Sequence, residues 1–180
     1  MRIKPENALV MIIDEQVKLL PTIYENEKIL KNTEILIKGL RLLDVPFLIT
    51  QQYTKGIGPS DPAIYESAGT EAYYEKRTFS CWDTQEIRDA IVSSGRRQIV
   101  LCGIESHICV MQTAIDLIAN GYTVYLVEDC ASSRRKNDKE TALRRMTAEG
   151  VLLTTYESLL FELMVTSTHP NFREVSKLIK

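Results

Sequence analysis

Cys109 is the residue of this sequence whose position most favours chemistry. It lies in segment 103–110, which joins an apolar run ending at Cys102 to a stretch with helical spacing. With Ser106 as the N-cap, Cys109 falls in the first helical turn, where unpaired N–H groups and the helix dipole favour the nucleophilic thiolate. The same N–H groups could hold an oxyanion during acyl transfer. The alternative is a buried apolar filler, the usual state of a free cysteine.

The positions of the other cysteines and of the two histidines give weaker evidence for a catalytic role. Cys81 and Cys102 are interpreted as fillers, whereas Cys130 stays open because it follows a strand. The four cysteines lack C-x-x-C spacing, which predicts reduced thiols in a cytoplasmic protein. His107 is two residues from Cys109 and would not face it on a helix, and His169 lies in the tail. Without an H-x-x-x-H or D-x-H pattern, we expect no metal site and no cofactor.

A carboxylate and a lysine are the better candidates to assist Cys109. Asp14 follows five apolar residues, so it stands at the end of a strand as a fixed anion, a proton acceptor or a cap of the next turn. Lys76 follows a long segment rich in glycine and proline, and the alternative for any lysine is a solvated surface position. Position alone does not decide between these readings.

The elements that must position these residues alternate between strand and helix. Runs of apolar, β-favouring residues predict strands covered on both faces, and stretches with apolar residues three and four apart predict covering helices. The fold class is therefore α/β: a three-layer α/β/α arrangement around a mainly parallel sheet with right-handed crossovers. The predicted strands are 9–13, 46–50, 98–102, 123–127 and 151–154, and the predicted helices are 29–43, 83–92, 107–119 and 138–148.

Two segments do not fit the repeat. Segment 51–73 has no sustained period and is predicted to be a long loop of the kind that often carries function. Segment 156–180 has helical character broken at His169-Pro170, and it could pack on the body of the protein or on a second subunit.

Length and charge limit the classes of function. The 180 residues fit a single domain, 1–180, and the net charge of −2 from 22 basic and 24 acidic residues indicates no nucleic-acid or membrane partner. Apolar runs such as 8–13 are too short to span a bilayer, which predicts a soluble protein.

Several motifs, in order along nearly the whole chain, resemble the isochorismatase-like cysteine hydrolases. This superfamily includes nicotinamidases, and the chain is most similar to the branch of isochorismatase domain-containing proteins, some of which are labelled mitochondrial-associated ribonuclease. The motifs are Ile13-Asp14-Glu15-Gln16, Thr50-Gln51-Gln52-Tyr53 with Lys55-Gly56-Ile57-Gly58, the segment 76–80, Cys102-Gly103-Ile104-Glu105 leading to Cys109, and His169-Pro170-Asn171-Phe172.

The resemblance implies a catalytic triad of Asp14, Lys76 and Cys109. It also implies a cis peptide bond between Ile104 and Glu105, with the N–H groups of Glu105 and Cys109 forming an oxyanion hole. Nicotinamidases carry an Asp-x-His metal motif after the second strand, whereas this chain has glutamines and a tyrosine there. A metal-dependent nicotinamidase is therefore disfavoured, and the presence of Cys109 points away from the vinyl ether chemistry of true isochorismatases.

Together these observations predict a hydrolase of a small amide or related carbonyl that works through a covalent acyl-enzyme. The predicted pocket residues are Gln16, Gln52, Tyr53 and Phe79. By analogy with the family we expect a homo-oligomer. The alternative is a binding or assembly module with an idle triad, because fold does not fix function. A ribonuclease is not favoured, since there is no basic face and no pair of histidines for phosphoryl transfer.

Overall fold

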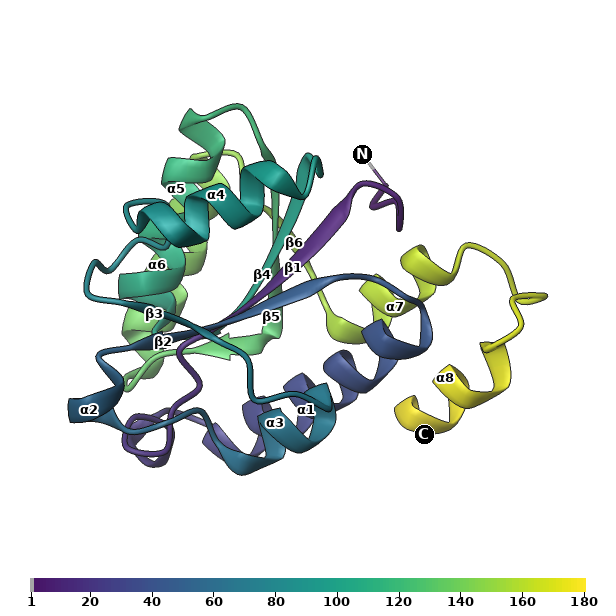
Figure 1. Ribbon diagram of the computed structural model, residues 1–180, viewed down its shortest axis with the longest axis horizontal. Coiled ribbons are helices and arrows are strands. Elements are labelled where there is room, and N and C mark those ends of the chain that lie inside the picture. Colours follow the sequence, from purple (N-terminus) through teal and green to yellow (C-terminus); the bar gives the residue numbers. More distant parts are fainter. Residues whose placement is uncertain (1) are drawn as a thin grey trace.

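The first strand shows why the sheet must be covered on both faces. The computed structural model describes residues 2–180 (Figure 1), and all six residues of β1 (Ala8–Ile13) are buried in it. Because side chains alternate along a strand, Val10 and Ile12 enter one apolar core while Met11 and Ile13 enter the other. A strand of this kind fits only the middle of a sheet between two helical layers.

Six parallel strands form that sheet, in the order β3-β2-β1-β4-β5-β6. The five predicted strands are all present, and three of them (β2, β4 and β5) are longer at their carboxyl ends than predicted. The short strand β3 was not predicted, because its three residues carry no apolar run. The bounds after β1 are β2 (Phe47–Gln52), β3 (Tyr74–Lys76), β4 (Gln98–Ile104), β5 (Thr123–Ser132) and β6 (Leu152–Thr154).

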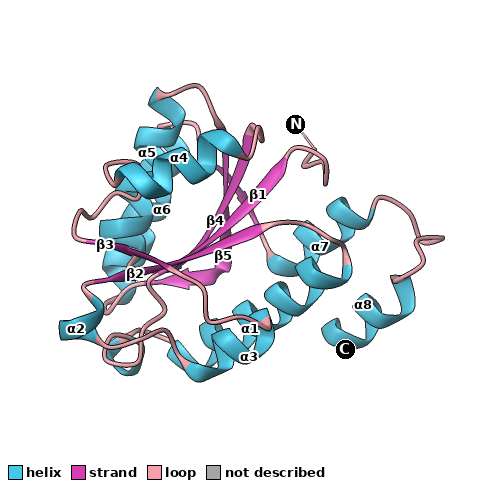
Figure 2. Cartoon of the chain, in the orientation of Figure 1, coloured by secondary structure: helices cyan, strands magenta, loops and turns pink. Residues whose placement is uncertain are grey.

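Helices cover the two faces, which confirms the predicted three-layer architecture (Figure 2). One face packs against α1 (Asn26–Leu42), α3 (Pro62–Ala68), α7 (Tyr156–Met164) and α8 (Phe172–Ile179). The other packs against α4 (Gln85–Ser93), α5 (Met111–Ala119) and α6 (Lys136–Ala148). The break in the tail at His169-Pro170 separates α7 from α8, as the sequence indicated.

The prediction of a long loop over 51–73 was wrong. The segment contains α2 (Thr54–Ile57) and α3, and it returns to the sheet as β3. Helix α3 begins at an Asp-Pro pair, where the Asp61 carboxylate accepts a hydrogen bond from the Ala63 N–H at 3.0 Å and Pro62 occupies the first helical turn. That cap signal is readable in the sequence, but the helix is too short to show a period.

Strands β1 and β4 approach each other closely at their carboxyl ends. Gly103 pairs with Ile13, and a Cβ added at Gly103 would lie 2.1 Å from the Ile13 carbonyl oxygen. Gly103 also has a φ of 110°, a conformation that side chains disfavour. Glycine is thus required where the chain turns from β4 toward Cys109. Among residues 2–180, no helix has the length and apolar character that a membrane span needs.

Candidate active site

The three residues singled out from the sequence meet at the carboxyl edge of the sheet. Asp14 follows β1, Lys76 ends β3, and Cys109 follows β4, which is the neighbour of β1. In an open parallel sheet this edge is the usual place for ligands. All three side chains are buried, with Cys109 the most exposed of them at 7%.

Asp14 is held by a hydroxyl and an ammonium group. Its Oδ1 accepts a hydrogen bond from Thr50 Oγ1 at 2.8 Å, and its Oδ2 accepts one from Lys76 Nζ at 2.7 Å. A φ of 54° at Asp14 turns the chain away from the strand, a conformation that aspartate tolerates better than most residues. The carboxylate is therefore fixed within the sheet edge and does not point into solvent.

Lys76 is a buried cation whose ammonium group is fully paired. Nζ donates to Asp14 Oδ2, to Gln52 Oε1 at 2.8 Å and to the Thr78 carbonyl oxygen at 3.3 Å. Burial acts to lower the pKa of Lys76, but the nearby Asp14 carboxylate, with contributions from Cys81 and Cys109, raises it above the ordinary value. The lysine is thus a permanent positive charge in the site, and a solvated surface position is ruled out.

The helix that begins before Cys109 differs from the prediction. Residues Ser106–Val110 form a π-helical turn, in which the Val110 N–H reaches the Glu105 carbonyl oxygen, and α5 starts only at Met111. Ser106 is not an N-cap that bonds the backbone: it is buried, and its Oγ has no hydrogen-bond partner. Wide turns of this type are frequent at functional sites.

The expectation that the helix start favours the thiolate of Cys109 was also wrong for the resting protein. Burial and the neighbouring Asp14 carboxylate raise the pKa of the Cys109 thiol to about 12, although Lys76 acts in the opposite direction. Desolvation and a fixed anion outweigh the helix terminus. Cys109 therefore rests as a neutral thiol beside the Asp14 carboxylate.

Glu105 leads into this turn. The Ile104–Glu105 peptide bond is cis, and the Glu105 carbonyl oxygen accepts hydrogen bonds from the N–H groups of Ile108 and Val110. The Glu105 side chain accepts two more from Arg134, from its backbone N–H at 2.9 Å and from Nε at 3.1 Å. The backbone between Glu105 and Cys109 is thereby tied to the end of β5.

The four predicted pocket residues divide into two pairs. The amides of Gln16 and Gln52 point inward. The Gln16 amide donates to the backbone carbonyl oxygen of Gln52 and accepts from its N–H group, and the Gln52 amide oxygen accepts from Lys76. The side chains of Tyr53 and Phe79 take no part in these amide hydrogen bonds. The guanidinium of Arg77 lies 3.7 Å from the centre of the Tyr53 ring, and the Phe79 side chain is 55% exposed.

Three residues at the site were not predicted. Thr50 anchors Asp14, and Thr113 links Cys109 to Cys81, since its hydroxyl donates to the Cys109 carbonyl oxygen at 2.7 Å and accepts from the Cys81 N–H at 2.9 Å. Cys81 lies among the charges of the site, and burial raises the pKa of its thiol to about 11. Thr50 could have been found from the sequence, because it is a polar residue near the end of a strand that neighbours the strand before Asp14.

Glu15, next to Asp14, points into the opposite core. Its Oε1 accepts a hydrogen bond from Thr33 Oγ1 of α1 at 2.8 Å, while its Oε2 is buried without a hydrogen-bond partner. Burial is the main reason that the pKa of Glu15 is raised to about 8, with Asp61 and Glu34 adding to the effect and Thr33 opposing it. Glu15 is a neutral acid at neutral pH.

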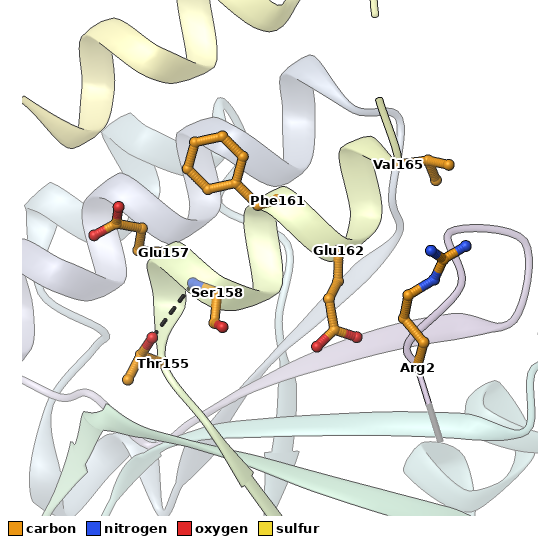
Figure 3. Close-up of a pocket in the computed structure, with 7 residues that line it drawn as sticks. All are labelled: Arg2, Thr155, Glu157, Ser158, Phe161, Glu162 and Val165. Atoms are coloured by element: carbon orange, nitrogen blue, oxygen red, sulfur yellow. Dashed lines mark hydrogen bonds between the residues drawn. The ribbon is translucent and has the colours of Figure 1, made fainter. Parts of the chain in front are cut away.

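A cavity of about 710 Å³ lined by Lys76, Arg77 and Thr78 adjoins this cluster, and another cavity lies apart from it. A cavity of about 480 Å³ follows the outer side of α7, and its lining includes Phe161, Val165 and Arg2 (Figure 3). Helix α7 packs on the face of the sheet opposite to the core that contains Cys109. Within residues 2–180, no group of three or more His, Cys, Asp or Glu side chains is placed to hold a metal ion.

The fold and the site define an α/β protein with a cysteine, a carboxylate and an ammonium group gathered at the carboxyl edge of a parallel sheet. Comparison with known sequences gives the family: residues 7–158 match the isochorismatase domain, and the chain belongs to the isochorismatase family. Its architecture is that of the isochorismatase-like hydrolases.

Relatives and solved structures agree with this assignment. Isochorismatase domain-containing protein 2 of Danio rerio is 35% identical over 99% of this chain and 89% of its own length. The structure of MAR1 ribonuclease from Caenorhabditis elegans superposes with a TM-score of 0.92 and 35% identity, covering 99% of this chain and 92% of the other. The YcaC gene product of Escherichia coli, described as an octameric hydrolase of unknown specificity, superposes with a TM-score of 0.89 at 22% identity, over 98% and 95% of the two chains.

Proposed function

We propose that this protein is a metal-independent cysteine hydrolase of a small amide or related carbonyl compound. The observation that carries the proposal is the buried ion pair of Asp14 and Lys76 beside the neutral thiol of Cys109. A thiol next to a fixed carboxylate has its base within reach, and a permanent cation balances the negative charge that develops. The chain has Gln51, Gln52 and Tyr53 in place of the Asp-x-His metal motif, and the amide oxygen of Gln52 accepts a hydrogen bond from Lys76.

In the proposed first step, Asp14 accepts the proton of the Cys109 thiol as Sγ attacks the carbonyl carbon. The electron pair of the carbonyl moves to its oxygen, which the N–H groups of Glu105 and Cys109 stabilise. Collapse of this intermediate expels the amine, which takes the proton back from Asp14. Water, deprotonated by Asp14, then attacks the thioester and releases the carboxylic acid and the free thiol.

The exposure of the site limits the size of the substrate. Only a small part of Cys109 is open to solvent, so the reacting carbonyl must be carried by a small or narrow molecule. Tyr53 and Phe79 are the proposed walls of the entrance, because Phe79 is exposed and the Tyr53 ring lies beside the exposed Arg77. Gln16 and Gln52 are proposed to lie on the side of the site away from this entrance.

The test is turnover and covalent labelling of a Cys109→Ala variant. A panel of small amides and esters is screened with the wild type, and acylation is followed by intact mass and peptide mapping. We expect Cys109→Ala to lose both turnover and adduct, while Cys130→Ala keeps both, because it removes another buried thiol that lies on the other face of the sheet. Full activity of Cys109→Ala would refute the nucleophile. A wild type that shows neither turnover nor adduct would favour the idle binding module.

We also propose that the protein assembles with copies of itself. Strand β6 is one of the two edge strands of the sheet, and it exposes Leu152 and Leu153. Phe161 and Val165 of the cavity beside α7 are exposed as well (Figure 3). An apolar sheet edge is usually covered in a native assembly, and the E. coli YcaC protein of the same fold is octameric. The four free, buried thiols fit the reducing conditions of the cytoplasm, which we propose as its location.

A further inference from the structure

The ammonium group of Lys76 has no donor left for a substrate. An ammonium carries three N–H donors, and Nζ donates to Asp14 Oδ2, Gln52 Oε1 and the Thr78 carbonyl oxygen, with the Cys109 thiol close beside it. One acceptor is an anion and two are neutral. Two of the three acceptors are side chains, and of these two Gln52 is the neutral one.

Gln52 is itself held so that its amide oxygen must face Lys76. Its Nε2 donates to the Arg77 carbonyl oxygen at 3.0 Å, which places the oxygen of the same amide on the other side. Its backbone is clamped by the buried side chain of Gln16: Oε1 accepts from the Gln52 N–H at 2.7 Å, and Nε2 donates to the Gln52 carbonyl oxygen at 2.9 Å. Gln16 Nε2 also donates to the Gly58 carbonyl oxygen at 2.6 Å, so both polar atoms of the Gln16 side chain are hydrogen-bonded.

The neutrality of Gln52 matters because Lys76 interacts with several ionisable groups at once. The titratable groups that act on Lys76 are Asp14 after β1, Cys81 after β3 and Cys109 after β4. Lys76 is the group that makes the Cys109 thiol easier to ionise, whereas burial and Asp14 make it harder. A second carboxylate at position 52 would compete for Lys76, and an apolar side chain there would leave one buried N–H without a partner.

From these contacts we infer that Gln52 is a positioning residue: as a neutral acceptor fixed by Gln16 and Arg77, it holds the charge of Lys76 toward Asp14 and Cys109 and does not bind substrate. The inference rests on the proposed function of Cys109 as a nucleophile. It assigns Gln52 a different role from that of a pocket residue, and it makes the reactivity of a thiol in the turn after β4 depend on an amide of β2, two strands away in the sheet.

The experiment measures alkylation of Cys109 by iodoacetamide, a small neutral reagent that needs no knowledge of the substrate. Second-order rates are determined by peptide mass mapping between pH 7 and 9.5 for the wild type, Gln52→Glu, Gln52→Met and Gln51→Met. Gln51 is the matched control, because it is a buried glutamine of the same strand whose amide bonds Ser60, Tyr65 and Thr54 and not Lys76. Circular dichroism and thermal melting establish that each variant is folded.

We expect the rate for Gln52→Glu to be about tenfold lower than that of the wild type at each pH, as an added anion disfavours the thiolate. Gln52→Met is expected to be several-fold slower, and Gln51→Met to match the wild type. If Gln52 bound substrate instead, both Gln52 variants would alkylate at the wild-type rate, and that result with a reactive Cys109 overturns the inference alone. A wild-type Cys109 that resists alkylation in the folded state but reacts after denaturation would overturn the nucleophile, and the role of Gln52 with it.

Discussion

Replacing Glu15 with glutamine should remove a large pH dependence from the stability of this protein. The pKa of Glu15 is about 8 in the folded chain against an ordinary value of 4.5, chiefly because of burial. At about 1.4 kcal/mol for each pH unit, this difference corresponds to roughly 5 kcal/mol between the two protonation states. Because the folded protein keeps a proton that the unfolded chain releases, the stabilisation is complete below pH 4.5 and is lost as the pH rises to about 8.

A loss of roughly 5 kcal/mol is a large part of the 5–15 kcal/mol that a typical domain has in total. The assay is urea unfolding between pH 4.5 and 9, followed by the fluorescence of Trp82, the single tryptophan. At low pH we expect Glu15→Gln to be less stable than the wild type by about 1–3 kcal/mol, because its NH₂ group replaces the unpartnered Oε2 and finds no acceptor. Toward pH 8 the order should reverse, since only the wild type must ionise a buried acid or give up stability.

Two variants make this test specific to Glu15. Glu6→Gln removes an exposed carboxylate and should run parallel to the wild type at all pH values. Thr33→Val removes the hydrogen bond that lowers the pKa of Glu15, so its loss of stability should extend to higher pH. A difference between the wild type and Glu15→Gln that stays constant from pH 4.5 to 9 would refute the reasoning.

Three further predictions concern packing and charge. Lys76→Met should lower the free energy of unfolding by about 3–5 kcal/mol, since it leaves the buried Asp14 carboxylate unpaired, and Asp14→Asn in the same chain should recover part of the loss in urea titrations. Gly103→Ala should abolish folding or cost more than about 4 kcal/mol by the same measurement, because its Cβ would meet the Ile13 carbonyl oxygen; wild-type stability would contradict the close approach. Leu153→Lys combined with Phe161→Glu should reduce the mass of the assembly in light scattering, whereas the exposed substitution Glu6→Gln should not.

The sequence predicts the sheet well because its strands are apolar over their whole length. Runs such as 98–102 leave no alternative to burial on both faces, and the helical stripes between them require parallel connections. It predicts short elements poorly. Strand β3 has only three residues, among them a glutamate and a lysine, and it exists because it pairs with β2 through Gln52 and Lys76. Pairing between distant segments leaves no periodic signal in either one.

Within the site, positions were predictable and interactions were not. Asp14 and Cys109 stand after apolar strands, so their place at the sheet edge follows from the pattern. The burial of Lys76 could not be predicted, because it depends on acceptors supplied by β1, β2 and the chain after β3. Gln16 and Gln52 look like pocket residues in the sequence, and only their hydrogen bonds show that both amides are already engaged.

The resting charge of Cys109 shows that a position at a helix start does not by itself determine the pKa of a thiol. A helix start favours a thiolate by interactions that are typically about 0.3–1 kcal/mol, whereas burial and a neighbouring anion act on the same group with several times that energy. The larger effects decide, and the thiol keeps its proton until a carbonyl approaches. In the proposed mechanism a neutral thiol is an advantage: the buried site then holds one anion and one cation, and charge separates only when Asp14 takes the proton and bond formation to the substrate has begun.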